Sequence, residues 1–308
     1  MITTPANLSK GYQPVIVDCV CCGRRLAERD EYCMDCQTPA SLSQTVSMRG
    51  SENQFVSVLG ASNAGKTVYL GLLLDILSKG PEDFRGMASS AFSVELQEQV
   101  VTALEHRMFP EKTPAEADAW KWLHCQISVT QKKETMEVDL ISPDFAGEAI
   151  AMEINQAGLY PAIQHIVAKS TGILILCDSM RVRDEGSGED LFAMKLATYI
   201  AGRHGLASDG KLKNRHPGPS IAIVFTKCDG CPEATQDPTQ FAANNTPRLF
   251  EFCRRTFIRH TFFAASVAGN SGLLADSTGL QMRIPFHVEP RGLVQPCLLY
   301  TSDAADDT

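Results

Sequence analysis

From residue 53 onward, short apolar runs alternate with longer stretches of helical periodicity. Two of the runs, residues 172–177 (GILILC) and 221–226 (IAIVFT), are apolar except for the final Thr226, which is typical of strands buried on both faces. Residues 123–130 alternate between apolar and polar positions and predict a strand with one polar face. The other predicted elements are strands at 55–59, 136–141 and 262–265 and helices at 67–77, 92–108, 190–203 and 246–257. This alternation indicates an α/β fold with a mostly parallel sheet and helices on both faces.

The first 52 residues lack this alternation. Residues 1–14 are polar and unpatterned, and we expect them to form a disordered tail. Residues 15–40 hold five of the 11 cysteines, and residues 41–52 are polar without periodicity, which predicts a linker. The main domain is therefore expected over residues 53–296.

Composition and charge narrow the class of protein. The chain has 308 residues, 44% of them hydrophobic, which is enough for one large domain and a small module. A formal net charge of -8 argues against nucleic-acid binding without a local basic patch. Residues 1–11 show no signal-peptide pattern, and the longest apolar stretch, 68–77, contains Asp75 and is too short to span a bilayer. We therefore expect a cytoplasmic chain without a membrane span, whose cysteines stay reduced or bind metal.

The last twelve residues, 297–308, resemble the translation of a transposon-type sequencing adapter. In that interpretation the native sequence ends near Pro296, and a genuine polar tail is the alternative. These residues are therefore left out of the fold prediction.

Residues 60–67 (GASNAGKT) match the pattern G-x-x-x-x-G-K-[ST] in full, between a predicted strand and a predicted helix. In such a loop the backbone N–H groups cradle phosphate oxygens, and the helix N-terminus adds positive potential. The loop residues are Gly60, Ala61, Ser62, Asn63, Ala64 and Gly65. Lys66 would bridge the β- and γ-phosphates, and Thr67 would ligate Mg²⁺. The pattern predicts nucleotide binding, and a glycine-bearing turn without a ligand is the alternative.

Residues 226–229 (TKCD) follow the buried strand 221–226 and match the guanine-reading motif [NT]-K-x-D. A carboxylate at Asp229 can accept hydrogen bonds from the ring N–H and the exocyclic amine of guanine, a donor pair that adenine lacks. Lys227 would lay its stem along the base, and Thr226 stands where Asn is commoner. An ordinary strand-to-loop turn is the alternative, and in that case the chain would be an ATP-using P-loop protein.

Residues 144–147 (DFAG) follow the strand 136–141 and supply the pattern D-x-x-G. Asp144 would hold Mg²⁺ through water, and the N–H of Gly147 would meet the γ-phosphate. Glu148 follows where many small GTPases carry a water-orienting Gln, and this departure puts the familiar hydrolytic mechanism in doubt. Two softer candidates are Thr113 as a switch threonine and Ser266, in residues 264–267 (AASV), as part of a loop that touches the base. A threonine in a Pro-rich loop without a ligand is the alternative for Thr113.

The ordered set GASNAGKT, DFAG, TKCD and AASV resembles a translation-factor-related (TRAFAC) GTPase domain over residues 53–296. The cysteine module and the long gaps between motifs resemble the bacterial double-GTPase type. The resemblance implies a three-layer P-loop NTPase fold and a switch that binds GTP or GDP with Mg²⁺, hydrolyses GTP slowly and serves unknown protein partners in a multi-protein system. Residues 285–290 would then lead into a last helix, which the suspected adapter replaces. A zinc-ribbon adaptor whose nucleotide pocket does not turn over is the alternative.

Asn63 gives the phosphate loop the pattern G-x-x-N-x-G-K-T. This resembles GTPases that bind K⁺ beside the nucleotide, in which the cation neutralises charge that develops during phosphoryl transfer. The resemblance implies turnover that depends on K⁺. Capping of the loop by local hydrogen bonds of Asn63 is the alternative.

Cys19, Cys22, Cys33 and Cys36 form two C-x-x-C pairs, which can present four thiolates to Zn²⁺. Gly23 suits a tight knuckle turn after Cys22, so Cys21 is the spare cysteine. A segment this short cannot build a core, so metal binding would supply its folding energy. The alternatives are an iron–sulfur site and a redox dithiol. Three arginines against five acidic residues in 18–36 favour a structural or protein-docking module over DNA binding.

Overall fold

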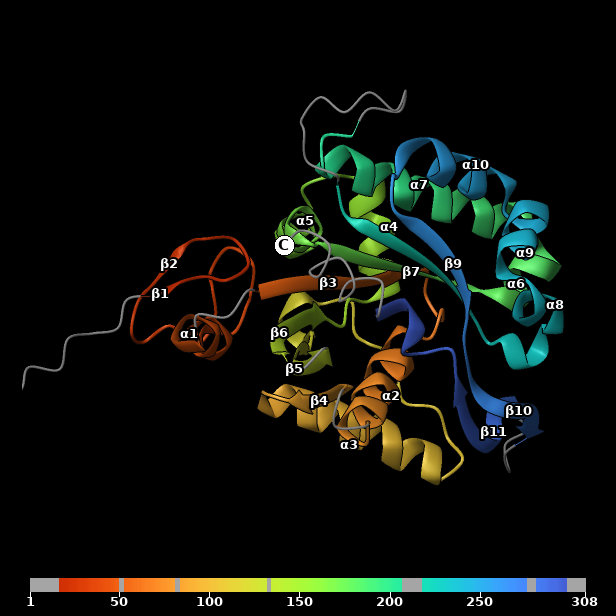
Figure 1. The fold of residues 1–308 in the computed structure, drawn as a ribbon, viewed down its shortest axis with the longest axis horizontal. Coiled ribbons are helices and arrows are strands. Elements are labelled where there is room, and N and C mark those ends of the chain that lie inside the picture. The colour runs from red at the N-terminus through yellow and green to blue at the C-terminus, as the bar shows by residue number, and fades with distance from the viewer. Residues whose placement is uncertain are drawn as a thin grey trace, which may run out of the picture.

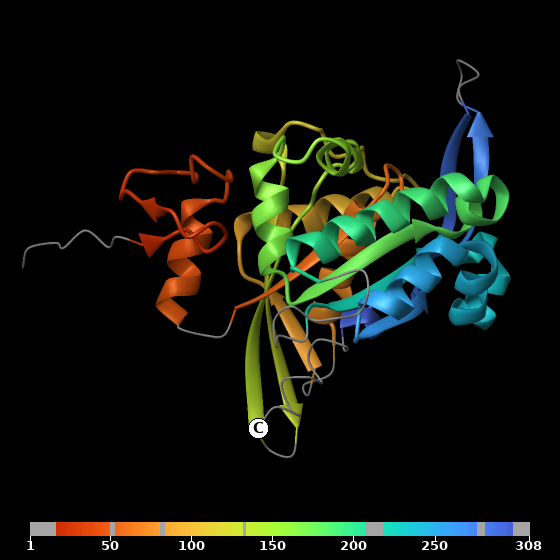
Figure 2. The same ribbon diagram turned by 90° about the horizontal axis from the view of Figure 1, so that it is seen from above.

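The computed structural model describes residues 17–49, 53–80, 84–131, 134–206, 218–275 and 281–297. The expected tail at 1–14 and residues 298–308 of the suspected adapter segment lie outside this range. Figure 1 shows a small N-terminal module beside a larger α/β body, and Figure 2 shows the same arrangement from above. The larger body is the part for which the sequence predicts alternating strands and helices.

A seven-stranded sheet forms the centre of the α/β body, in the order β4-β5-β6-β3-β7-β8-β9. Its strands are β3 (Asn53–Gly60), β4 (Phe84–Ala88), β5 (Trp122–Gln131), β6 (Glu134–Pro143), β7 (Gly172–Asp178), β8 (Ser220–Thr226) and β9 (His260–Ala264). Strands β6, β3, β7, β8 and β9 pair in parallel, and β5 is antiparallel to both of its neighbours. The predicted mostly parallel sheet is therefore confirmed, with β5 as the strand that runs the other way.

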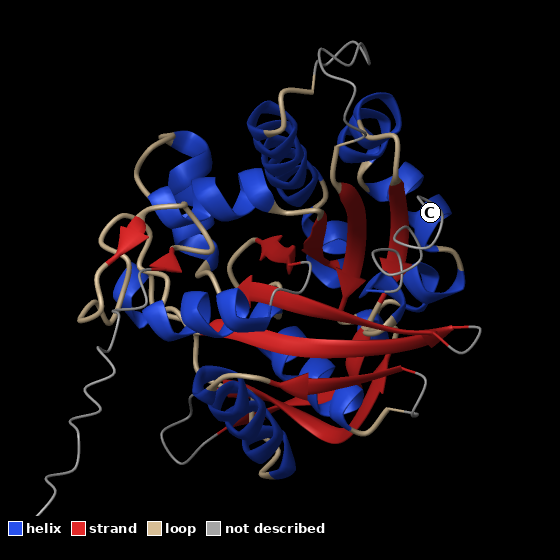
Figure 3. Cartoon of the chain, turned by 60° about the vertical axis from the view of Figure 1, so that its left-hand side comes forward, coloured by secondary structure: helices blue, strands red, loops and turns tan. Residues whose placement is uncertain are grey.

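Helices cover both faces of this sheet (Figure 3). They are α2 (Lys66–Ser78), α3 (Ala91–Glu105), α4 (Gly147–Asn155), α5 (Pro161–Lys169), α6 (Ser179–Glu185), α7 (Ser187–Arg203), α8 (Pro232–Gln236), α9 (Pro238–Asn245) and α10 (Pro247–Thr256), with short 3-10 turns η1 (Ala117–Ala119) and η2 (Cys228–Gly230). Every residue of β7 and β8 is buried, as the two apolar runs predict. Leu174 and Leu176 join the hydrophobic cluster with α2 and α3, whereas Ile173 and Ile175 join the cluster on the other face. The sheet therefore separates two cores.

Close packing between α2 and α3 depends on Gly71. A Cβ at this position would lie 2.5 Å from Cγ2 of Val100 on α3. Because α2 begins directly after the phosphate loop, this contact holds the start of that helix against the rest of the layer.

The N-terminal module consists of the strands β1 (Val17–Asp18) and β2 (Arg25–Leu26) and the helix α1 (Ala40–Arg49). The prediction of a linker over 41–52 is wrong for residues 41–49, which are helical. Leu42, Ser43 and Val46 are buried, and the hydroxyl of Ser43 accepts a hydrogen bond of 3.1 Å from the backbone N–H of Val20. Contacts with the cysteine segment therefore stabilise a helix whose own sequence has little amphipathic pattern.

The last strands form a separate antiparallel hairpin, β10 (Ser266–Ala275) and β11 (Gln281–Arg291). Figure 2 shows this hairpin, in blue, projecting from the body. Residues 285–290, expected to lead into a last helix, lie in β11, because they pair across the hairpin with β10, as in the pair Ser271 and Pro285. Cys297, the first residue of the suspected adapter segment, is buried in the cluster beneath α2. Within the described residues no helix combines the length and apolarity needed to cross a bilayer.

Candidate functional site

A cavity of about 380 Å³ lies among the motif loops. From the predicted set it is lined by Ser62, Asn63, Gly65, Lys66, Thr67, Thr113, Gly147, Glu148, Thr226, Lys227 and Asp229. Its walls also include Phe145 and Ala146 of DFAG, Ala265 and Val267 of AASV, and residues that belong to no predicted motif, namely Val68, Tyr69, Phe109, Pro110, Glu111, Lys112, Ala268, Ser271, Arg283 and Leu293. The structure therefore brings together loops that are separated by more than 150 residues of sequence.

The phosphate loop connects β3 to α2 and has the backbone that such a loop needs. Gly65 has a φ of 86° and Asn63 a φ of 65°, both in the left-handed region. A Cβ at Gly60 would lie 2.5 Å from the carbonyl oxygen of Leu176 on the neighbouring strand, so only glycine fits there. The loop therefore curls directly above the end of β3, with its N–H groups at the start of α2.

Lys66 is almost completely buried at the start of α2. Its Nζ donates hydrogen bonds to the carbonyl oxygens of Gly60 at 3.2 Å and Ala61 at 2.9 Å. Burial lowers the pKa of Lys66 to about 8, although Asp144 and Glu148 nearby favour its charged form. The amine is thus held inside the loop where phosphate oxygens would meet it.

Three oxygen atoms from three separate segments meet beside Lys66. The hydroxyl of Thr67 lies 2.9 Å from the hydroxyl of Thr113, and each of them donates to Oδ2 of Asp144 at 2.9 Å. The second carboxylate oxygen of Asp144, Oδ1, is buried without a hydrogen-bond partner among the described residues. Burial raises the pKa of Asp144, and the two threonine hydroxyls and Lys66 oppose this effect. Thr113, which no sequence motif identifies, therefore lies next to the motif residues Thr67 and Asp144.

The loop 144–147 lies directly on the phosphate loop. A Cβ at Gly147 would come within 2.3 Å of the backbone nitrogen of Ser62, so glycine is required at this approach. The hydroxyl of Ser62 donates a hydrogen bond of 2.6 Å to Oε1 of the exposed Glu148 and lowers the pKa of that carboxyl. Glu148 thus faces the phosphate loop from the start of α4.

The other end of the site is formed at the carboxyl end of β8. Thr226 donates through Oγ1 to the carbonyl oxygens of Ala64 at 2.9 Å and Cys177 at 3.3 Å, which connects the TKCD segment to the phosphate loop. Lys227 has a left-handed φ of 58°, and its Nζ lies 2.5 Å from Oδ2 of Asp178. Asp229 lines the cavity, and Ser266 does not, although its neighbours Ala265 and Val267 do.

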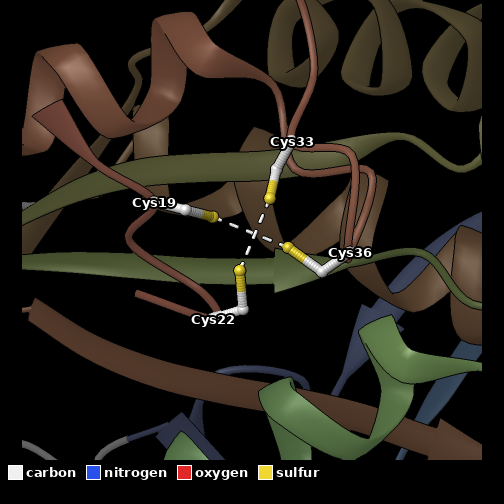
Figure 4. Close-up of side chains that lie close together, drawn as sticks. All are labelled: Cys19, Cys22, Cys33 and Cys36. Carbon is white, nitrogen blue, oxygen red and sulfur yellow. Dashed lines mark hydrogen bonds between the residues drawn. The ribbon is translucent and has the colours of Figure 1, made fainter. Parts of the chain in front are cut away.

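A second cluster of candidate residues lies in the N-terminal module. The Sγ atoms of Cys19, Cys22, Cys33 and Cys36 all lie within 4.8 Å of one another (Figure 4). The Cys19–Cys36 and Cys22–Cys33 separations are 3.5 Å and 3.4 Å. A tetrahedral ion with Zn–S bonds of about 2.3 Å holds its sulfurs about 3.8 Å apart, so the cluster fits the size of zinc. Cys21 is buried but does not belong to this group.

The two halves of this cluster share one backbone pattern. The N–H of Gly23 donates to the carbonyl of Cys19, and the N–H of Gln37 donates to the carbonyl of Cys33, both at 2.8 Å. Gly23 and Gln37 both have positive φ, at 79° and 57°. Hydrogen bonding from Cys36 lowers the pKa of Cys19 to about 4, whereas burial raises that of Cys22 to about 12. Two matching turns therefore aim their thiols at one point, as a four-thiolate metal site requires.

The comparison with family models decides the class of the larger body. Residues 57–199 match the family model described as Double-GTPase 1. The chain carries a P-loop GTPase domain of the double-GTPase type. The matched stretch of the GTPase domain includes GASNAGKT and DFAG, while TKCD follows it in the sequence.

Among solved structures, three GTP-binding proteins are similar to this chain at low identity. Nucleolar GTP-binding protein 1 of Plasmodium falciparum has a TM-score of 0.39 at 14% identity, covering 83% of this chain and 90% of that one. The Arl6 small GTPase of Trypanosoma brucei, with bound GppNp, has a TM-score of 0.41 at 10% identity, covering 83% and 100%. The signal recognition particle receptor complex SRb-GTP/SRX of Chaetomium thermophilum has a TM-score of 0.37 at 11% identity, covering 71% and 93%. No curated protein matches the sequence.

Proposed function

We propose that this GTPase domain binds GTP with Mg²⁺, hydrolyses it slowly to GDP and phosphate, and acts as a nucleotide switch in a bacterial multi-protein system. The observation that carries the proposal is the contact of Thr67, Thr113 and Asp144, which joins the phosphate loop to two further loops. A nucleotide switch needs such a meeting point, because a change at the terminal phosphate can then act on the loops of Thr113 and Asp144 at once.

The residues at this point fit a magnesium ion. Hydroxyl and carboxylate oxygens are the ligands that Mg²⁺ prefers, and one buried oxygen of Asp144 has no hydrogen-bond partner in the described part of the chain. Thr67 would ligate the ion, and Asp144 would hold it through water. When bound, the ion supplies positive charge to the β- and γ-phosphate oxygens. Lys66 adds a second positive charge from inside the loop, and the backbone N–H groups of the phosphate loop orient the phosphates.

The loops around 110–115 and 144–150 are the parts that would report the state of the nucleotide. Thr113 belongs to a segment without regular secondary structure, so its position depends on contacts such as that with Asp144. Gly147 would offer its N–H to the γ-phosphate. Loss of that phosphate would remove one partner from each loop and change the surface that a protein partner binds.

The test is a titration of the full chain with fluorescent GTP, GDP and ATP, with Mg²⁺ and with a chelator. GTP should bind at least tenfold more tightly than ATP. Asp229→Asn should weaken GTP binding by roughly 5- to 150-fold, because a mismatched buried hydrogen bond costs about 1–3 kcal/mol. Glu233→Gln, an exposed position in the next turn, is the matched control and should leave GTP affinity unchanged.

Two outcomes would change the proposal in different ways. Equal affinities of the wild type for GTP and ATP would refute guanine selectivity. Tight, stoichiometric binding of GTP without release of phosphate would refute turnover and support a non-hydrolysing adaptor. Thr113→Ala should weaken the binding of GTP more than that of GDP if the threonine responds to the terminal phosphate. Equal losses of affinity for both nucleotides would contradict its role as a switch residue.

A further inference from the structure

The hairpin β10–β11 starts from a fixed point at the guanine motif. The N–H of Ala265, the residue before β10, donates to the carbonyl oxygen of Phe225 at 2.7 Å. The carbonyl oxygen of Ala265 accepts a hydrogen bond of 3.2 Å from the N–H of Cys228, inside the TKCD sequence. The first residues of the hairpin are therefore positioned by the same backbone that positions Asp229.

The end of the hairpin is tied to the phosphate-loop side of the site. Gly292 follows β11 with a φ of 71°, and a Cβ there would lie 1.9 Å from the carbonyl oxygen of Ala264. The next residue, Leu293, accepts a hydrogen bond of 2.6 Å through its carbonyl from the hydroxyl of Tyr69 on α2. Because both ends are anchored at the site, the hairpin has a defined position relative to the cavity.

Four residues of the hairpin line the cavity, and two of them, Ser271 and Arg283, are polar. Arg283 on β11 and Ser271 on β10 both line it, and Nη1 of Arg283 donates to Oγ of Ser271 at 3.0 Å. The same guanidinium nitrogen lies 3.9 Å from the sulfur of Met180 on α6. Arg283 is thus held between its own hairpin and the segment that follows β7.

The charge of Arg283 acts on the guanine end of the cavity. Burial raises the pKa of Asp229, and the positive charges of Arg283 and Lys227 oppose this effect. The cations that act on Asp144, at the phosphate end, are Lys66 and Lys121. Met180, which Arg283 contacts, also packs against Gly230, the residue after Asp229, because a Cβ at Gly230 would lie 2.7 Å from the Met180 sulfur. Arg283 therefore lies at the base end of the site.

We propose that the β10–β11 hairpin completes the nucleotide site and that Arg283 binds the base of the bound guanine nucleotide beside Asp229. The inference rests on the proposed binding of guanine nucleotide. A guanidinium group suits this place because it is planar, stays charged, and can either stack on a purine or donate hydrogen bonds to its ring acceptors O6 and N7. Ser271 acts as a positioning residue by holding Nη1.

The experiment compares Arg283→Ala, Arg283→Lys and Arg291→Ala with the wild-type full chain in titrations with fluorescent GDP and GTP. Arg291 is the matched control, because it lies on the same strand, pairs with Glu289 and does not line the cavity. Arg283→Ala should lower affinity for GDP and GTP equally, by about tenfold, since the base is common to both. Arg283→Lys should lose part of that affinity, and Arg291→Ala should stay within about twofold of the wild type.

Hydrogen–deuterium exchange supplies a second measurement. Nucleotide should slow amide exchange in 266–275 and 281–291 of the wild type, and Arg283→Ala should lose this protection while its nucleotide-free exchange stays unchanged. Unchanged affinity and protection in Arg283→Ala would refute the inference while leaving the proposed function intact. Equal losses in Arg283→Ala and Arg291→Ala would also refute it, because the effect would then belong to the strand. A wild-type chain that binds no guanine nucleotide would refute the proposed function itself.

Discussion

Replacing Lys66 by methionine should make the nucleotide-free protein more stable while weakening its nucleotide binding. Lys66 is buried, and its Nζ has two carbonyl oxygens as hydrogen-bond acceptors, at Gly60 and Ala61. A buried ammonium group lacks most of its hydration, and two neutral carbonyls replace this only in part. Methionine keeps the length of the side chain without the charge.

The size of the effect follows from the pKa of Lys66, which burial lowers from 10.5 to about 8. At 1.36 kcal/mol for each pH unit, this difference corresponds to about 3 kcal/mol. Between pH 8 and pH 10.5 the unfolded chain binds more protons than the folded chain, so the free energy of unfolding rises with pH in this window. Below pH 8 the full penalty is present. Lys66→Met removes this penalty but also loses two hydrogen bonds worth about 1 kcal/mol each. At neutral pH the variant should therefore be roughly 1 kcal/mol more stable than the wild type.

Urea unfolding of the nucleotide-free chain at several values between pH 7 and pH 10 measures this effect. The difference in free energy of unfolding between Lys66→Met and wild type should shrink as the pH rises, and it should reverse sign near the upper end. Lys79→Met is the control, because Lys79 is exposed and pairs with Asp75 on the same helix. A difference that stays constant over the whole range would refute the interpretation that Lys66 is a destabilised buried cation.

Three further predictions concern the zinc cluster, the potassium dependence and the anchor of the hairpin. The purified chain should hold about one zinc ion, Cys36→Ser should lose it and Cys21→Ser should keep it, as elemental analysis would show; full zinc occupancy in the first variant would contradict the site. Phosphate release should be faster in KCl than in NaCl at matched ionic strength, and Asn63→Ala should abolish the difference; equal rates in the wild type would exclude a potassium requirement. Gly292→Ala should lower the free energy of unfolding by about 2–3 kcal/mol, because its Cβ would lie 1.9 Å from a backbone oxygen at the end of β9. Gly188→Ala, whose Cβ would meet nothing within 4 Å, should not lower the free energy of unfolding in the same urea titration.

The elements predicted from sequence are those whose pattern is set by burial. All ten strands and helices predicted from residue 53 onward are present, with ends that differ by a few residues. Strands β7 and β8 are buried on both faces, so their interior positions are apolar and their polar residues stand only at the strand ends. The grouping of the loops that follow β3, β6 and β8 was also predictable, because parallel strands bring their carboxyl ends to one edge of the sheet.

The elements that the sequence did not predict depend on contacts far along the chain. Strand β4 has one buried residue in five, and its place at the edge is set by pairing with β5. Strand β10 carries glycines typical of a loop, and one of them, Gly272, leaves room for the ring of Phe286 across the hairpin, which a Cβ would approach within 2.5 Å. A glycine covered by a cross-strand aromatic ring is a stable arrangement, but it can be predicted only when the pairing register of the two strands is known.

The same reason explains why the site itself was predicted only in part. Lys66, Thr67, Asp144 and Asp229 belong to motifs in which the local backbone places the side chain, so their neighbours in sequence identify them. Arg283 reaches the cavity through a hairpin, and nothing in its own surroundings in sequence points to a nucleotide.

Helix α1 shows that a long-range contact can fix the position of a secondary-structure element as well as of a site residue. Nη1 of Arg49, in its last turn, lies 3.0 Å from Oδ1 of Asp139 on β6, and Nε2 of His124 on β5 lies 2.8 Å from the same atom. Asp139 is almost completely buried, and a buried carboxylate needs partners of this kind, since an unpaired one is strongly destabilising. The pairing therefore fixes the end of a helix that its own sequence does not predict. It also connects the cysteine module to β6, the strand that leads into the loop of Asp144.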